Sequence, residues 1–187
     1  MSLSPTKREI LETLLLNDKP MNAMDIAKET SKEFEAIRMQ ILGLAKMKYV
    51  RVPEKGLWII TQKGKEALGV PETSKEKAVA ILAYEPHDKA FAFYLELGKP
   101  LNLHAHNLRD FANKIEKVNA MSIQFHMERG DFEAWFNGLG DQELAKKVAL
   151  LKQRGVTGEE LRRQLRQIVM ERYRALANLA GQPVYNE

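Results

Sequence analysis

The sequence contains no cysteine, so disulfides, thiol nucleophiles and cysteine-ligated metal sites are excluded. No apolar run approaches the roughly 20 residues that a membrane-spanning helix needs, and we therefore expect no membrane partner. The first five residues, Met-Ser-Leu-Ser-Pro, lack the charged and apolar regions of a signal peptide. Together these absences predict a protein of the reducing cytoplasm.

Motifs that carry catalysis are missing as well. The sequence has no glycine-rich phosphate loop, no Ser-His-Asp order and no clear carboxylate pair, so we expect no enzymatic activity and no cofactor. His104 and His106 would share one face of a strand and, with His126 and a carboxylate, could hold a metal. Because two histidines at this spacing are a common coincidence, we expect no metal site, and a metal-dependent activity is the third hypothesis.

Charge is unevenly distributed along the chain. The net charge is +4, with 29 Lys and Arg against 25 Asp and Glu. Residues 1–75 and 146–187 carry a net positive charge, whereas residues 76–145 carry a net negative one. Basic ends can face nucleic-acid phosphates, and they can equally be solvated helix faces. Charge alone leaves both interpretations open.

The first 70 residues show alternating helix and strand signals. Apolar residues at helical spacing predict helices over residues 5–17, 23–29 and 32–47. Residues 49–52 and 57–60 read as two strands joined by the turn Pro-Glu-Lys-Gly, and Met21 could add a short strand pairing. Thr61 is expected to cap a last helix over residues 62–68. We therefore predict three helices, a hairpin and a closing helix.

Residues 5–69 resemble archaeal and bacterial winged helix-turn-helix regulators. Two phrases carry the resemblance, Leu-Ala-Lys-Met-Lys-Tyr-Val at residues 44–50 and Trp-Ile-Ile-Thr-Gln-Lys-Gly at residues 58–64. The resemblance implies that the helix over residues 32–47 enters the major groove of double-stranded DNA and that the hairpin contacts the backbone. It implies a DNA-binding transcriptional regulator.

The resemblance also implies which side chains face DNA. Arg38 and Gln40 would bond base edges, and five lysines and arginines would meet phosphates. Those five are Lys32, Lys46, Lys48, Arg51 and Lys55. Glu33 and Glu35 disfavour DNA binding, because their carboxylates would repel phosphates. The alternative is a protein-interaction module that keeps the winged-helix fold without binding DNA.

Residues 71–76 read as a linker between a domain over residues 1–70 and a second domain over residues 77–187. In the second domain we expect strands over residues 77–84, 90–95, 101–105 and 122–126, which would form a small antiparallel sheet. Helices are expected over residues 108–117, 131–137, 141–153 and 158–180. The predicted fold class is thus α+β, a winged helix-turn-helix plus a small sheet-and-helices domain that ends in a long helix.

The phrase Phe-His-Met-Glu-Arg-Gly-Asp-Phe-Glu-Ala-Trp at residues 125–135 and the phrase Leu-Gly-Asp at residues 139–141 resemble an archaeal domain family of unknown function. That resemblance covers about residues 78–153 and implies no activity. His126, Arg129 and Asp131 could line a pocket for a small-molecule effector. Alternatively, Asp131 caps its helix, Arg129 pairs with a nearby carboxylate and His126 packs between layers.

The last predicted helix has an apolar stripe, with arginines on its other faces. The stripe is formed by Leu161, Leu165, Ile168, Val169, Leu176 and Leu179. It could pack on its own domain or form the seam of a homodimer, since winged-helix regulators often pair to match DNA half-sites. The homodimer is slightly favoured.

Overall fold

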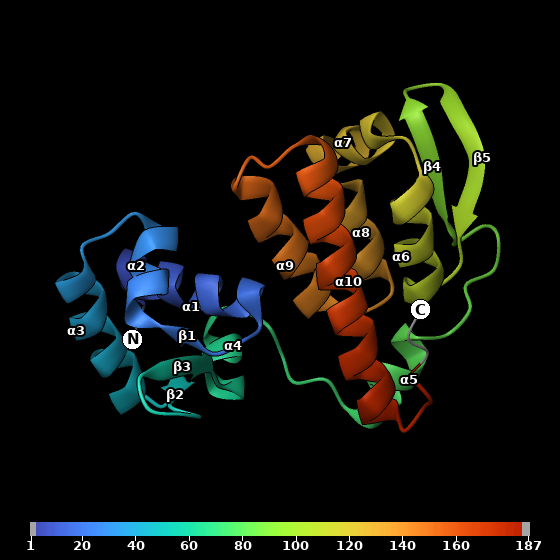
Figure 1. Cartoon of the computed structure of the whole chain (residues 1–187). Coiled ribbons are helices and arrows are strands. Elements are labelled where there is room, and N and C mark those ends of the chain that lie inside the picture. Colours follow the sequence, from blue (N-terminus) through green and yellow to red (C-terminus); the bar gives the residue numbers. More distant parts are fainter. Residues whose placement is uncertain (1–2, 185–187) are drawn as a thin grey trace. The chain divides into compact units, whose positions relative to one another are not determined.

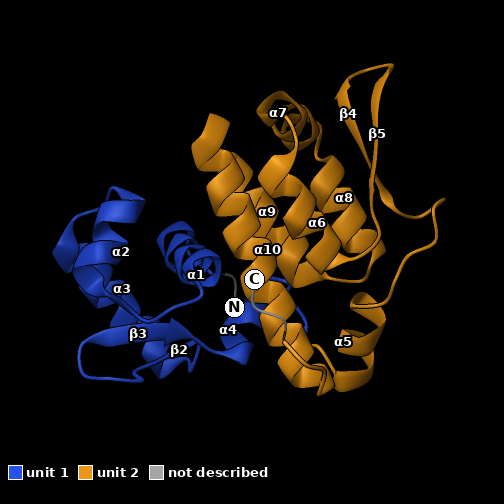
Figure 2. Cartoon of the chain, turned by 45° about the vertical axis from the view of Figure 1, so that its right-hand side comes forward, with its two compact units in different colours: residues 1–72 blue, residues 73–187 orange. Residues whose placement is uncertain are grey.

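The computed structural model describes residues 3–184, and the chain divides into two compact units, residues 1–72 and 73–187 (Figures 1 and 2). The division falls within the segment predicted to be a linker. The fold class is mixed α and β, with two small antiparallel sheets. Each unit has its own buried core and is described separately below.

Unit 1 combines helices with a short three-stranded sheet. Its elements are α1 (Pro5–Asn17), β1 (Met21–Asn22), α2 (Ala23–Thr30), α3 (Phe34–Lys46), β2 (Val50–Arg51), β3 (Leu57–Ile60) and α4 (Gln62–Ala67). The strands are antiparallel in the order β1-β3-β2. Helix α1 packs on α2, α3, β3 and α4, and the core consists mainly of aliphatic side chains from the first three helices. The predicted element order of this unit is confirmed.

The Thr-x-x-Gly phrase of residues 61–64 has a packing function. The Thr61 hydroxyl accepts a hydrogen bond from the Gly64 amide and donates one to the Lys48 carbonyl at 2.7 Å. A Cβ at Gly64 would lie 2.2 Å from the Tyr49 carbonyl oxygen, so only glycine lets α4 approach this backbone so closely. The phrase therefore anchors α4 to the start of the hairpin.

Unit 2 is a helical cluster with one hairpin. Its elements are α5 (Lys75–Ile81), β4 (Phe91–Glu96), β5 (Lys99–Ala105), α6 (Leu108–Lys117), α7 (Ala120–Arg129), α8 (Asp131–Gly138), α9 (Gln142–Gln153) and α10 (Gly158–Ala180). Helix α10 packs on α5, α6, α7 and α9, and β4 packs on α7 (Figure 1). Phe91, Phe111, Phe132 and Phe136 form an aromatic core in which neighbouring rings meet mostly edge to face.

Two predicted strands are wrong, and both segments are helices. Residues 77–84 lie largely in α5, which the Ser74 hydroxyl caps by accepting from the Lys77 amide. Residues 122–126 lie in α7, where Ser122, Ile123 and His126 are buried at helical spacing. The apparent alternation of residues 122–126 was too short to separate the two periods. The sheet of unit 2 consequently has two described strands, not four.

The predicted bounds of α10 are confirmed, but its surroundings differ from the homodimer expectation. Of the predicted stripe, only Leu179 is substantially exposed, and the other members are buried inside unit 2. The buried stripe is therefore not available to a second copy of the chain. The homodimer remains a prediction, but this stripe no longer supports it. Of the arginines on the other faces of α10, Arg172 is buried. Among residues 3–184, no helix combines the length and apolarity that crossing a membrane requires.

Candidate functional site

The outer face of α3 is the first candidate site. Ile37, Ile41 and Leu44 turn inward, which leaves the opposite side of the helix in solvent. After the C-cap residue Met47 of α3, Lys48 takes a left-handed conformation (φ 62°) and turns the chain into β2. The hairpin then projects through an exposed turn at residues 52–56. Helix α3 and this hairpin are thus presented by the same buried core.

Most of the cations predicted to face DNA are exposed. Arg38, Lys46, Lys48, Arg51 and Lys55 are exposed, whereas Lys32 and Gln40 are half-buried. The Lys32 ammonium lies 3.0 Å from a Glu9 carboxylate oxygen, and Arg38 lies 3.5 Å from Glu35. Pairs this exposed are weak, so they compete little with a phosphate partner.

A hollow that the sequence did not predict lies beside these cations. It has a volume of about 490 Å³ and is mainly apolar. Its lining residues are Asn22, Ala23, Met24, Phe34, Arg38, Ile41, Leu42, Gly56 and Trp58. Met24, Leu42 and the nearby α3 residue Met39 are exposed, with Met39 at 66%. Arg38 and Gly56 share this hollow, so α3 and the hairpin tip border the same surface.

The second candidate site is a hollow of about 370 Å³ in unit 2. The lining comes from β4 and its turn, from α7 and from the start of α8. The lining residues are Phe91, Ala92, Tyr94, Leu97, Phe125, His126, Arg129 and Asp131. The three predicted pocket residues are therefore brought together at one hollow, with aromatic and aliphatic side chains around them.

Hydrogen bonds hold His126 in a single tautomer. Its Nε2 accepts from the Tyr94 amide at 2.9 Å, so this nitrogen carries no proton. Its Nδ1 lies 2.7 Å from Asp131 Oδ2 and is therefore the donor. Burial lowers the pKa of His126, although the bond to Asp131 opposes that shift. His126 is a neutral positioning group rather than a free base.

The Tyr94 amide is available to His126 because the hairpin is irregular there. The pairing of β4 with β5 shifts register between Phe93 and Tyr94. On β5, Asn102 has a left-handed conformation (φ 51°) within the skipped stretch. A bulge of this kind leaves a backbone amide without its hydrogen-bond acceptor on the neighbouring strand. The Tyr94 amide donates to His126 Nε2 instead. The imidazole thereby fastens the hairpin to α7.

Arg129 and Asp131 meet across a tight helix-to-helix turn. Gly130 (φ 76°) ends α7 and precedes α8, and this left-handed turn lets Asp131 reach back. Asp131 Oδ2 accepts from Arg129 Nε at 3.1 Å as well as from His126. The predicted helix cap is wrong, because Asp131 is the first residue of α8 and makes no capping bond. The Arg129 guanidinium also lies over the Phe125 ring, 5.1 Å from its centroid.

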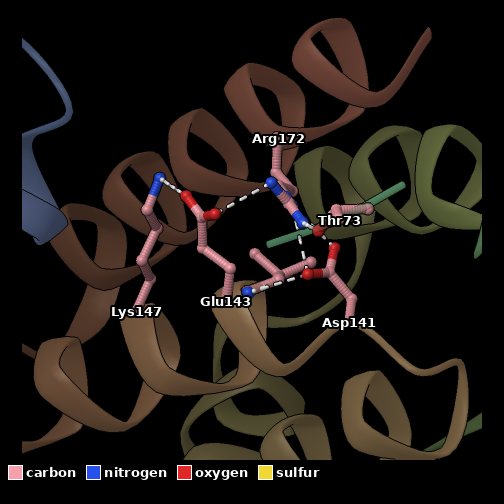
Figure 3. Close-up of polar contacts among 6 residues, drawn as sticks. Thr73, Asp141, Glu143, Lys147 and Arg172 are labelled. Atoms are coloured by element: carbon pink, nitrogen blue, oxygen red, sulfur yellow. Dashed lines mark hydrogen bonds and ion pairs between the residues drawn. The ribbon is translucent and has the colours of Figure 1, made fainter. Parts of the chain in front are cut away.

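A buried charge network forms the interior of unit 2 (Figure 3). Arg172 donates from Nε to Asp141 at 2.9 and 3.1 Å and from Nη1 to Glu143 at 3.0 Å. Its Nη2 donates to the Thr73 hydroxyl, and Lys147 lies 3.2 Å from Glu143. These contacts pair two cations with two carboxylates. It joins α9, α10 and the segment before α5, and sequence reasoning missed it.

The other three histidines gather at the end of β5. The His87 ring centroid lies 4.2 Å from that of His104 and 6.3 Å from that of His106. His106 Nδ1 lies 2.8 Å from the Glu85 carbonyl oxygen. His126 has both ring nitrogens occupied, so the metal site of His104, His106 and His126 is not assembled. Across residues 3–184, no three His, Cys, Asp or Glu side chains are placed to hold a metal.

Comparison with known protein families finds a match in unit 2. Residues 81–170 are similar to DUF5752, a family of unknown function. The match covers much of the domain whose phrases indicated a family of that kind. It includes the lining of the unit 2 hollow and Asp141, Glu143 and Lys147 of the charge network, and it ends just before Arg172. No curated protein and no solved structure matches the chain.

Proposed function

We propose that unit 1 is a winged helix-turn-helix that binds double-stranded DNA in a transcriptional regulator. In this arrangement α3 enters the major groove and the β2–β3 hairpin lies along the backbone. The observation that carries the proposal is the solvent face of α3, with Arg38 and Lys46, continued by Lys48, Arg51 and Lys55. The element order and the β1-β3-β2 sheet also support it.

Gln40 and Arg38 are the base-reading candidates on this face. An amide side chain pairs bidentately with adenine, and a guanidinium pairs with guanine. Arg38 is only loosely bound to Glu35 in the free protein, so base contact costs little. Lys46 ends α3, and Lys48, Arg51 and Lys55 follow it in the chain. These cations would neutralise phosphates, which sets affinity rather than sequence preference.

The test is binding to mixed-sequence duplex DNA at several salt concentrations. The double variant Arg38→Ala, Lys55→Ala should bind about tenfold or more weakly and show a shallower salt dependence. The control Arg8→Ala, Lys28→Ala removes the same charge from exposed positions on α1 and α2 and should bind as the wild type does. Equal losses in both variants would show that net charge, and not this face, governs binding.

A gain in affinity gives a stricter test, because a poorly folded variant cannot produce it. Glu35 is exposed in the first turn of α3 and would repel phosphates. Glu35→Gln should therefore strengthen binding severalfold at low salt, and the gain should shrink as salt screens the charge. The matched change Glu66→Gln, at an exposed position on α4, should leave affinity unchanged.

A second candidate function follows from the apolar hollow beside α3. Exposed Met24 and Leu42 at its edge suit a docked apolar peptide side chain better than a phosphate backbone. This supports the protein-interaction alternative, in which unit 1 binds a protein partner. Absence of DNA binding even at low salt would overturn the first proposal and leave this one.

A further inference from the structure

We infer that the hollow of unit 2 binds a small zwitterion with an apolar side chain, the chemistry of an apolar α-amino acid. The inference stands apart from DNA binding, because every residue that lines the hollow belongs to unit 2. Its volume of about 370 Å³ lies in the range of small-ligand sites. A ligand there would make unit 2 the sensing part of the chain.

The polar side of the hollow contains one cation and one anion. His126 adds no charge, because its Nε2 accepts the Tyr94 amide and must be unprotonated. Arg129 and Asp131 remain, and they form an ion pair. A simple anion would be attracted by Arg129 and repelled by the Asp131 carboxylate. A simple cation would be attracted by Asp131 and repelled by Arg129. A zwitterion aligned against the pair places opposite charges at both positions.

Each member of the pair keeps bonding capacity for a ligand. Arg129 uses Nε on Asp131, and among residues 3–184 no side chain or carbonyl accepts a bond from its two Nη groups. Asp131 accepts both of its side-chain bonds through Oδ2, which leaves Oδ1 without a donor among the same residues. The Nη groups can therefore bind a carboxylate, and Oδ1 can accept from an ammonium.

The rest of the lining suits an apolar side chain. Leu97 is 80% exposed and Tyr94 is 36% exposed, although both border the hollow. Phe125 forms another part of the wall, and the Arg129 guanidinium lies over its ring. A bound aliphatic or aromatic side chain would cover these groups, which supplies the hydrophobic part of the binding energy.

The hollow is also preorganised. His126 is held between the Tyr94 amide and Asp131, and Asp131 is in turn fixed by Arg129. The carboxylate therefore needs no rearrangement to accept a ligand, which reduces the cost of binding. This accounts for a buried neutral histidine next to an ion pair at the edge of an apolar hollow.

The experiment is calorimetric titration of the full chain with L-leucine and L-phenylalanine. Saturable binding at one site is expected for at least one of them. N-acetyl-L-phenylalanine lacks the ammonium and L-phenylalaninamide lacks the carboxylate, and both should bind at least about tenfold more weakly than L-phenylalanine. Arg129→Gln should weaken amino-acid binding about 10- to 100-fold, as expected for loss of a charge-assisted bond.

The matched control is Arg163→Gln, which removes another exposed arginine paired with a carboxylate, on α10. It should leave binding unchanged, and the backbone amide resonances of Tyr94 and Gly130 should shift with ligand in the wild type. Absence of binding in the millimolar range would overturn the inference. The inference would also be overturned if the blocked analogues bound as tightly as L-phenylalanine, or if Arg129→Gln bound the amino acid as tightly as the wild type. None of these outcomes bears on DNA binding by unit 1.

Discussion

The two units use their charged side chains in opposite ways. In unit 1 the cations of α3 and the hairpin are in solvent, the Arg38–Glu35 ion pair is exposed, and the Lys32–Glu9 pair is half-buried. In unit 2, Arg172, Lys147, Asp141 and Glu143 are buried and bonded to one another. Exposed charges contribute little to stability and remain available to a partner, whereas buried charges must be matched inside the protein. Unit 1 thus exposes charges that a partner can bind, whereas unit 2 buries Arg172, Lys147 and their two carboxylate partners in its interior.

The largest expected effect breaks the buried network. Arg172→Met removes the side chain that bonds to both Asp141 and Glu143 (Figure 3). It leaves the buried Asp141 carboxylate without its cation, whereas Glu143 keeps Lys147. Unfolding of unit 2 should become easier by about 3–5 kcal/mol, as is usual when one partner of a buried pair is lost.

The measurement is urea denaturation followed by tryptophan fluorescence. Trp58 lies in unit 1 and Trp135 in unit 2, and the chain has two tryptophans in all. A Trp58→Phe background therefore reports unit 2 alone, and Trp135→Phe reports unit 1. The unit 1 transition should not move with Arg172→Met. A loss below about 1 kcal/mol in unit 2 would mean that the network behaves like a surface pair.

The next effect in size acts on unit 1. Gly64→Ala would place a Cβ 2.2 Å from the Tyr49 carbonyl oxygen and 2.8 Å from Ile60 Cγ1. The backbone must shift to relieve these contacts, so we expect unit 1 to lose about 1–3 kcal/mol, as for overpacked cores. The Trp135→Phe background measures the loss. Gly43→Ala is the control, because its nearest neighbour is the flexible Lys7 side chain at 3.4 Å. If both variants retain wild-type stability, α4 is not held by this close approach.

Features formed by residues close together in the sequence could be predicted, whereas features formed by residues far apart in the sequence could not. The bounds of α1 and α10 were predicted because caps and apolar periodicity are local signals. The cluster of His126, Arg129 and Asp131 was also predicted, since these residues lie within one helical turn or two. The Tyr94 amide that fixes the histidine lies 32 residues away, and Arg172 lies 29 and 31 residues from its two carboxylate partners. Nothing in the pattern along the chain indicates such pairings.

The helices α5 and α7 were misassigned for a related reason. Both are short, and their apolar residues are as compatible with a buried strand as with a helix. Their helical state is decided by neighbours, because Ala78 and Ile81 are buried in unit 2 beside α10, and His126 is tied to β4. The deciding contacts are tertiary and were not visible in the sequence.

A smaller effect concerns pH. Burial lowers the pKa of His126, and the neutral ring is the form that accepts the Tyr94 amide. The unfolded chain takes up a proton near pH 6.5 that the folded chain resists, so unit 2 should lose stability as pH falls below about 6.5 and keep it above. Urea midpoints in the Trp58→Phe background at successive pH values measure the loss. His126→Gln should flatten the profile, whereas His87→Gln, at an exposed histidine, should retain it. An unchanged profile in His126→Gln would assign the acid sensitivity to other groups.

The smallest effect tests whether pairing without burial stabilises unit 2. Arg163 bonds to Glu160 on the solvent side of α10, and this bond, with help from Gln164, lowers the pKa of Glu160 to about 2. Arg163→Gln should raise that pKa toward 4.5, which a carboxyl NMR titration would show. Since a lowered pKa in the folded state stabilises it above that pKa, the urea midpoint of unit 2 at neutral pH should fall slightly in the variant. Solvent screening of this exposed pair should keep the loss well below that caused by Arg172→Met. A loss as large as that of Arg172→Met would mean that exposed pairs also organise this unit, and the distinction between its buried and exposed charges would then fail.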